Sequence, residues 1–210
     1  FRKDSSCVPM NANVMNNNRG KLLAAVAVLA MIACVFVAVM PADNAEATDT
    51  PGVDVPADYQ AYVLDDSGKF TGYTTLQNAV NEASSGATIY LNKNATANGI
   101  INGDGVKIDT SVVKSLTIDF NGLTYNMNGT PVGSSGTETQ AFQLLTGGSV
   151  TMKDGKITGD GQNVKMLIQN YCNLTLNNMV VDATVGNNNV SYTVSNNCGD
   201  VVLSGATTIT

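Results

Sequence analysis

A short pattern of apolar and polar positions returns five times along the chain. In each copy two apolar residues flank one residue of any kind, and a short polar turn comes next. The copies are Ile89-Tyr90-Leu91, Leu116-Thr117-Ile118, Val150-Thr151-Met152, Leu174-Thr175-Leu176 and Val201-Val202-Leu203. Their first residues are 27, 34, 24 and 27 positions apart. Repeats of this period are typical of stacked supersecondary units, none of which buries its apolar face alone.

Two further apolar stretches accompany the later copies. Alternating segments at 142–146, 166–170 and 192–196 precede the last three copies, and Leu123, Ile157 and Val181 each lie seven residues after a first anchor. The connections are too short and too rich in Gly and Asn for helices. Parallel strands joined without helices predict an all-β fold, a right-handed parallel β-helix or solenoid. The longest interval, of 34 residues, contains a polar segment at 129–140, which we expect to protrude as a loop.

One amphipathic helix is expected before the first coil. Thr74 and Gln77 match a capping box, with Thr74 as N-cap and Gln77 at the third helical position. Apolar residues recur at helical spacing on one face and Gly86 ends the helix. A short strand at 61–64 and a turn at 65–69 precede it. We therefore expect residues 61–86 to form an N-terminal cap over the coils of 87–210.

The first 60 residues differ in composition from the rest. Residues 1–14 are interpreted as upstream sequence or a misassigned start. Residues 15–47 carry a positive start, a long apolar run and small residues at 45–47. This order predicts a helical signal peptide cleaved after Ala47, or an uncleaved N-terminal anchor, and either places the remainder of the chain outside the cell or on its surface. Residues 48–60, with Pro51 and Pro56, are expected to be a flexible or extended linker.

The charge after Ala47 is strongly negative. Seven Lys and no Arg stand against fourteen Asp plus Glu, and the chain has no His. Such a surface repels phosphate backbones, so nucleic acid is excluded as a partner. We expect no cofactor, and membrane contact only through the N-terminal segment.

Three segments carry a family resemblance. Residues 73–80, 86–91 and 114–122 are similar to the opening of secreted pectate-lyase-like right-handed β-helix proteins, in particular the adhesin-like surface proteins of bacteria and methanogenic archaea. The resemblance implies the fold, but that fold hosts enzymes, adhesins and fibres alike. We expect an adhesin, a carbohydrate- or partner-binding module or a structural stalk. It would present ladders of Thr, Ser and Asn to an extracellular glycan or a cell-surface partner.

Exposed tyrosines would add stacking faces to such a surface. Tyr90, Tyr125 and Tyr192 are the candidates, although Tyr192 is expected to serve in strand packing instead.

The alternative is a polysaccharide lyase or glycoside hydrolase whose catalytic coils lie beyond this sequence. Enzymes of the resembled fold use calcium-binding acids with an Arg or Lys base, or clustered Asp with a His. Asp119 and Asp154 are a conceivable carboxylate pair, but their offsets place them on opposite faces of regular strands. No catalytic residue is therefore predicted, and we expect that the protein is not an enzyme.

Cys172 and Cys198 come two residues after Asn170 and Asn196, at matching places in neighbouring coils. Coils stack about 4.8 Å apart, which suits a disulfide between them. The alternative is a pair of reduced thiols in the core. Asn170 and Asn196, with Thr146 at the same bend, are expected to form a hydrogen-bonded ladder or else surface turns.

Two further sets of residues are candidates for ligands or modification. Three aspartates are each followed by Gly: Asp104, Asp154 and Asp160. They are weak candidates for calcium ligands, and the alternative is that they are ordinary turn residues. Asn128 and Asn189 are the sequons that we expect in loops, and so the better glycosylation candidates.

The sequence stops at Thr210 within an expected strand. We therefore expect a fragment truncated at its C-terminus. An uncapped last coil predicts end-to-end self-association.

Overall fold

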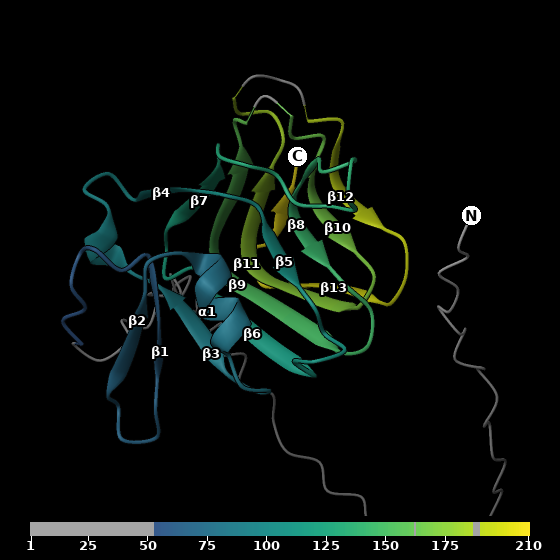
Figure 1. Cartoon of the computed structure of the whole chain (residues 1–210). Helices are drawn as coiled ribbons and strands as arrows, with labels where there is room; N and C mark the ends of the chain where they lie inside the picture. The colour runs from purple at the N-terminus through teal and green to yellow at the C-terminus, as the bar shows by residue number, and fades with distance from the viewer. Residues whose placement is uncertain (1–52, 162, 187–189) are drawn as a thin grey trace, which may run out of the picture. The chain divides into compact units, whose positions relative to one another are not determined.

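The computed structural model describes residues 53–161, 163–186 and 190–210. The expected upstream segment, signal peptide or anchor, its cleavage site after Ala47 and the sequon at Asn189 lie outside the described residues. The described part is an all-β parallel solenoid of about four turns, as the sequence predicts. Each turn has three sides, and strands of successive turns lie side by side (Figure 1).

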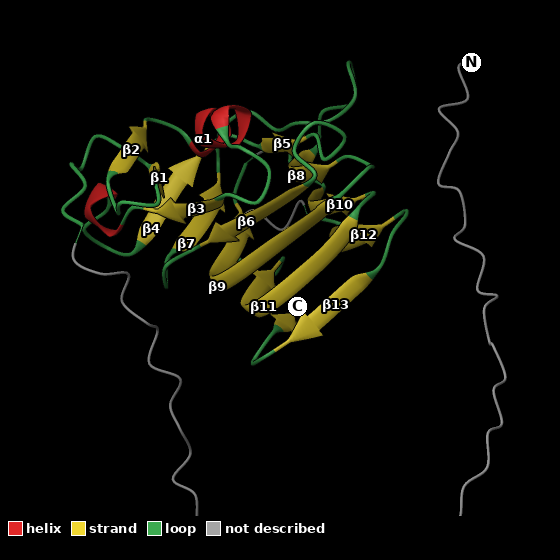
Figure 2. Ribbon diagram, turned by 90° about the horizontal axis from the view of Figure 1, so that it is seen from below, coloured by secondary structure: helices red, strands yellow, loops and turns green. Residues whose placement is uncertain are grey.

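The first side holds the repeated pattern. Its strands are β3 (Thr88–Leu91), β6 (Ser115–Asp119), the start of β9 (Ser149–Gly159), the start of β11 (Asn173–Asp182) and β13 (Val201–Ser204). They are parallel and run across one sheet (Figure 2). The last four copies are in register, with Val150 between Leu116 and Leu174, and Leu174 beside Val201. The first copy is shifted by two residues, because Ile89 pairs with Ile118 rather than Leu116.

The second side forms a separate parallel sheet. Its strands are β5 (Val106–Ile108), β8 (Gln140–Leu144), β10 (Met166–Asn170) and β12 (Tyr192–Asn196). Ile168 lies between Phe142 and Val194, so the alignment expected from sequence is wrong by two residues at β8. Thr146 consequently lies beyond the strand, and Leu144 is the partner of Asn170. Strand β5 was not predicted, although Val106-Lys107-Ile108 has the same apolar–polar–apolar order as the repeated copies.

The third side completes each turn. It consists of β4 (Ile100–Gly103), β7 (Thr124–Met127), the ends of β9 and β11, and β14 (Thr208–Ile209). Ile157 pairs with Val181 as expected, but its other neighbour is Tyr125 and not Leu123. The shift arises because the bend between β6 and β7 is longer than the bend within β9. Glycine at position 122, with φ of 78°, supplies the extra left-handed residue there.

Three polar residues make the bend between the first and third sides. Asn121, Asp154 and Asn178 have φ of 54°, 56° and 53°, a left-handed conformation that Asn and Asp tolerate better than other non-glycine residues. The Asn178 amide donates to Asp154 Oδ1 over 3.0 Å. The backbone N–H of Ala206 in turn donates to Asn178 Oδ1 over 3.0 Å. Polar side chains are therefore linked along the stack at this bend.

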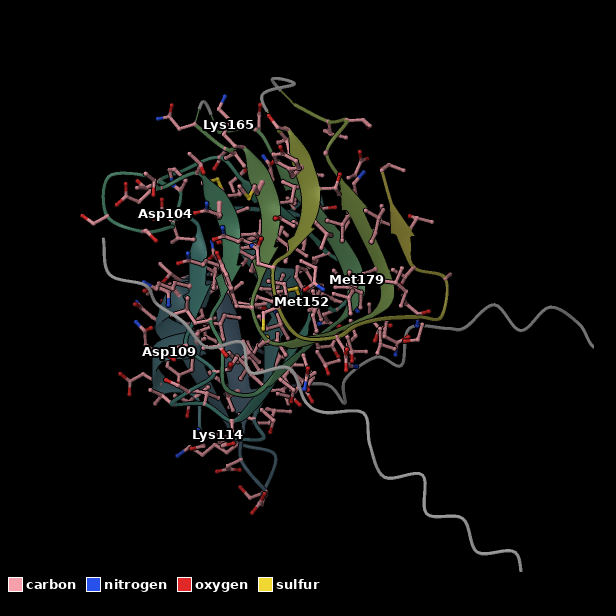
Figure 3. The ribbon with its side chains drawn as sticks, turned by 90° about the vertical axis from the view of Figure 1, so that its right-hand side faces the viewer. Asp104, Asp109, Lys114, Met152, Lys165 and Met179 are labelled. Carbon is pink, nitrogen blue, oxygen red and sulfur yellow. The ribbon has the colours of Figure 1, made fainter. Side chains whose placement is uncertain are left out.

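The core fills the interior of the turns. Met152 and Met179 lie within it, fully buried, while Asp104, Asp109, Lys114 and Lys165 lie at the margin (Figure 3). Stacking thus buries the apolar pattern that a single turn would expose.

The helix α1 (Leu76–Glu82) lies beside the first turn (Figure 1). It packs against β1 (Ala61–Leu64), β2 (Phe70–Tyr73), β3 and β5 through buried Leu76, Ala79 and Val80. The N-cap is Thr75, whose hydroxyl accepts from the Asn78 N–H over 3.1 Å, so the assignment of Thr74 is wrong by one residue. Strands β1 and β2 form an antiparallel hairpin, and β1 also pairs antiparallel with β3.

The side chain of Gln77 bonds to the outer edge of β5. Its Oε1 accepts from the Lys107 N–H over 2.6 Å, and its Nε2 donates to the Lys107 carbonyl over 3.0 Å. The amide thereby takes the place of a neighbouring strand for this residue.

Residues 53–60 are held against the fold, although the sequence suggests a flexible or extended linker. Val55 is buried, and the Asn92 amide donates to the carbonyls of Pro56 and Tyr59, each over 2.9 Å. Asn92 begins the short 3-10 helix η1 (Lys93–Ala95). Its buried amide therefore fixes the segment that leads into β1.

Candidate binding surface

The outer face of the first-side sheet carries rows of polar side chains. Thr117, Thr151 and Thr175 are in register on β6, β9 and β11, and each is half-buried. Their strand neighbours Leu116 and Ile118 point inward and are buried. Because side chains alternate along a strand, the hydroxyl-bearing residues are set on the outer face. Successive members of the row are spaced by about 4.8 Å.

Two parallel rows flank the threonines. Ser115, Ser149 and Asn173 form one row. The other row crosses more strands and consists of Tyr90, Asp119, Lys153, Asn177 and Ser204. The face therefore presents hydroxyl, amide and charged groups in order, with Tyr90 at its start. The ring of Tyr90 stacks on that of Tyr62, with centroids 5.3 Å apart.

Lys153 joins two carboxylates within this face. Its Nζ lies 2.6 Å from Asp119 Oδ2 and 3.1 Å from Asp154 Oδ2. The prediction that these two carboxylates lie on opposite faces is therefore wrong. Asp154 departs from strand geometry at its left-handed bend, which breaks the alternation that the prediction assumed.

The electrostatics of this cluster do not favour a role for Lys153 as a catalytic base. Partial burial would lower the pKa of Lys153, but hydrogen bonds to Asp119 and Asp154 outweigh it and raise that pKa above its usual value. Lys153 is thus a cation at neutral pH, which suits an ion pair or anion contact rather than proton abstraction.

A second ion pair links the third and fourth turns. Lys156 Nζ lies 2.8 Å from Asp182 Oδ2, and the Thr184 hydroxyl donates to Asp182 Oδ1 over 2.6 Å. The hydrogen bond from Lys156, then that from Thr184, lowers the pKa of Asp182 well below its usual range.

The structure brings Asn170 and Asn196 together. The Asn170 amide donates to Asn196 Oδ1 and to the Cys172 carbonyl, each over 2.8 Å, and Asn170 is fully buried. Asn196 is exposed and donates to the Gly199 carbonyl over 3.1 Å. Thr146 is exposed and has no place in this row.

Cys172 has a free, buried thiol, so the structure lacks the expected disulfide between Cys172 and Cys198. The bend of the last turn has one residue more than that of the turn before, and Gly199 lies directly against the Cys172 carbonyl there. Burial raises the pKa of the Cys172 thiol to about 11, so it is unreactive at neutral pH.

The three calcium candidates do not converge. Asp104 is exposed after β4 and accepts from the Thr130 N–H over 2.7 Å, Asp154 contacts Lys153, and Asp160 comes directly after β9. Among the described residues no three His, Cys, Asp or Glu side chains are grouped so that they could hold a metal ion.

The remaining candidates differ in accessibility. Asn128 is exposed just after β7. Tyr125 is buried and donates its hydroxyl to the Asp104 carbonyl over 2.6 Å, so it offers no stacking face. Tyr192 is 58% exposed, contrary to the packing role expected for it.

Sequence reasoning missed a groove between α1 and the turn after β5. Its volume is about 400 Å³, and it is lined by Gln77, Val80, Asn81, Lys107, Asp109, Val112 and Val113. No motif indicates it, because its two walls are 30 residues apart in the sequence, as Gln77 and Lys107 are.

A scan against protein-family models gives no match for this chain. Neither the curated proteins nor the solved structures include one that is significantly similar to it. Within the part of the chain that the structure describes, no helix is long and apolar enough to cross a membrane.

Proposed function

We propose that the chain is a secreted or cell-surface β-solenoid that binds an extracellular glycan or partner through the outer face of its first-side sheet. The observation that carries the proposal is the in-register row Thr117, Thr151 and Thr175, flanked by the Ser/Asn row and by the Lys153 cluster. Such a face offers many hydroxyl, amide and carboxylate groups on rigid strands. A ligand with repeated polar groups would meet them without reorganising the protein.

The proposal includes a more specific fold than a parallel β-solenoid. We place the chain with pectate-lyase-like right-handed β-helices of the adhesin-like surface type, with α1 and the β1–β2 hairpin as an N-terminal cap. The hydrogen bonds of Gln77 to β5 and the burial of Leu76, Ala79 and Val80 support the cap. The preference of parallel crossovers for one hand supports the right-handed form. The apolar and small residues of 22–47 support secretion.

A polysaccharide-active enzyme is the second candidate, favoured by the two carboxylates that meet at Lys153. Glycosidases of most families use a carboxylate pair. Here, however, a cation bridges both carboxylates, and its raised pKa opposes a role as base. Binding without turnover is therefore the proposed activity.

A glycan array probed with the full chain tests the proposal. We expect retention of one class of polysaccharide and no product in the bound fraction. Thr151→Val, which keeps the branched shape and removes the hydroxyl, should weaken binding by about fivefold, since a lost hydrogen bond contributes about 1 kcal/mol.

Thr124→Val is the matched control, because Thr124 is half-buried on β7 of the third side. Equal loss from both variants would contradict the assignment of the face. Release of oligosaccharide products would contradict the proposal of binding without turnover and support the enzymatic function.

A further inference from the structure

Four Asn-Gly pairs lie in the described part of the chain. They are Asn98-Gly99, Asn102-Gly103, Asn121-Gly122 and Asn128-Gly129. In such a pair the glycine nitrogen can attack the side-chain carbonyl carbon of the asparagine, because glycine has no Cβ to obstruct the approach. The attack requires the glycine N–H to lose its proton, so a hydrogen bond from that N–H to another residue opposes it. The four pairs therefore differ in reactivity according to what each glycine N–H binds.

Three of the four glycine N–H groups are directed at a neighbouring turn of the solenoid. Gly122 donates to the Asp154 carbonyl over 2.7 Å, and Gly129 donates to the Gly103 carbonyl over 3.1 Å. Gly103 itself lies in β4, and its carbonyl accepts from the Asn128 N–H at the end of β7. Because the N–H and C=O of a strand residue point to the same side, the Gly103 N–H also faces β7, the partner of β4.

Gly99 differs from the other three glycines. Its carbonyl accepts from the Thr124 N–H over 2.9 Å, but no described residue accepts from its N–H. Its φ is 75°, and apart from its chain neighbours no atom lies within 4 Å of the position that a Cβ would occupy. Asn98, which precedes it, is exposed. The nitrogen of Gly99 is therefore unobstructed, and the side chain that it would attack is in water.

The side-chain oxygen of Asn98 accepts two hydrogen bonds. The Thr96 hydroxyl donates to Oδ1 over 2.7 Å, and the Ile100 N–H, which is shared with Thr96 Oγ1, donates to it over 3.2 Å. Negative charge develops on this oxygen when a nitrogen attacks Cγ, so donors already aimed at it lower the barrier. By comparison, Asn102 Oδ1 accepts a single bond among the described residues, from Asn126 over 2.9 Å.

We propose that Asn98 is a site of spontaneous deamidation in the folded protein, favoured by the free Gly99 N–H and by the two donors on Asn98 Oδ1. The Gly99 nitrogen bonds to Asn98 Cγ, the Cγ–Nδ2 bond breaks, and ammonia leaves with the proton that the nitrogen has lost through water. A water molecule then opens the succinimide ring at either carbonyl, which leaves aspartate or isoaspartate at position 98. Either product adds a negative charge next to β4, and isoaspartate also lengthens the backbone that leads into this strand. The proposal does not depend on the glycan-binding function.

Peptide mapping of the full chain during incubation at neutral pH tests the site. Digestion after lysine gives peptides 94–107 and 115–153, and fragmentation assigns each exchange of an amide for an acid to one asparagine. In the folded protein Asn98 should convert at least about fivefold faster than the other three, because each competing glycine must first break a hydrogen bond. In urea, where these bonds are absent, the four asparagines should convert at similar rates. Equal rates in the folded protein, or a lead of Asn98 that persists unchanged in urea, would overturn the proposal.

Thr96→Val tests the donor to Asn98 Oδ1. In the folded chain, with unchanged circular dichroism, it should slow the conversion of Asn98 about fivefold, and in urea it should have no effect. Thr130→Val is the matched control, because Thr130 is exposed and directly follows the Asn128-Gly129 pair. This variant should leave the rate at Asn98 unchanged. A folded Thr96→Val protein that converts as fast as the parent chain would contradict the proposed role of the two donors.

Discussion

The first and last turns are built from the same apolar pattern but end differently. At the first turn, α1 buries Leu76 and Val80 against the strands, and Gln77 bonds to the edge of β5. At the last described turn, Leu203 and Ile209 are in register with buried residues of the turn before, but their own side chains are 52% and 39% exposed. The repeated pattern therefore specifies stacking, whereas closure of the stack depends on residues outside the pattern.

The largest effect should come from comparing one core position in two turns. Leu176 and Leu203 are register partners, fully buried and 52% exposed respectively. Leu176→Ala should lower the free energy of unfolding by about 2–5 kcal/mol, because it leaves a cavity. Leu203→Ala should cost less than about 1 kcal/mol. Urea denaturation of dilute samples measures both, and equal costs would show that the last turn is covered.

Removal of the Gln77 amide tests closure of the first turn. Gln77→Leu keeps the size of the side chain but leaves the Lys107 N–H and carbonyl without their protein partner, at a cost of about 0.5–1.5 kcal/mol because both groups are exposed to water. Glu82→Leu, exposed at the end of the same helix, is the control and should change stability by less than about 0.5 kcal/mol. If the control cost as much as the Gln77 variant, the bonds to β5 would not be the cause.

The start of α1 offers a smaller test with adjacent residues. Thr75→Ala removes the N-cap and should cost about 1 kcal/mol. The same change at Thr74 should cost less than about 0.5 kcal/mol, since the Thr74 hydroxyl accepts only a long side-chain bond of 3.4 Å from Asn78. Thermal unfolding of the two variants distinguishes them. A larger loss of stability from Thr74→Ala than from Thr75→Ala would support the capping box with Thr74 as N-cap, which the sequence suggested.

The smallest effect should come from the ion pair between the third and fourth turns. Because the folded pKa of Asp182 lies below its usual value of 3.8, its contribution is present above that pH and is lost as the pH falls through the folded pKa. Asp182→Asn should therefore cost less than about 1 kcal/mol at pH 7, as expected for a solvent-screened pair. It should also flatten the fall in stability below pH 4. Urea midpoints at pH 7 and pH 3 provide the measurement, and an unchanged acid slope would contradict the assignment.

The sequence predicts the solenoid because alternation of apolar residues survives in every turn. It misplaces Phe142, Leu123 and Ile89 by two residues each, because a shift of two keeps the alternation and leaves no trace in the pattern. Only the bend lengths decide between such registers, and these depend on left-handed residues such as Asn121.

The sequence predicts that the candidate site consists of rows of polar side chains, but it does not predict the contacts among them. The rows of Thr, Ser and Asn result from outward positions of aligned strands. The contact of Lys153 with Asp119 and Asp154 does not, because it needs the left-handed conformation of Asp154. The Gln77 bond to Lys107 joins residues 30 positions apart and has no local signature. The sequence leaves open whether Cys172 is bonded, and the structure shows a free thiol there.

Amide hydrogen exchange in the full chain tests the difference between the first and the last described turns most directly. We predict that the Lys107 amide is protected, and that Gln77→Leu abolishes this protection. We also predict that amides on the outer edge of β12 and β13 exchange rapidly in the same sample. Equal protection at β5 and at the edge of the last turn, or a Lys107 amide indifferent to Gln77, would contradict a stack that is closed at its first turn and open at its last.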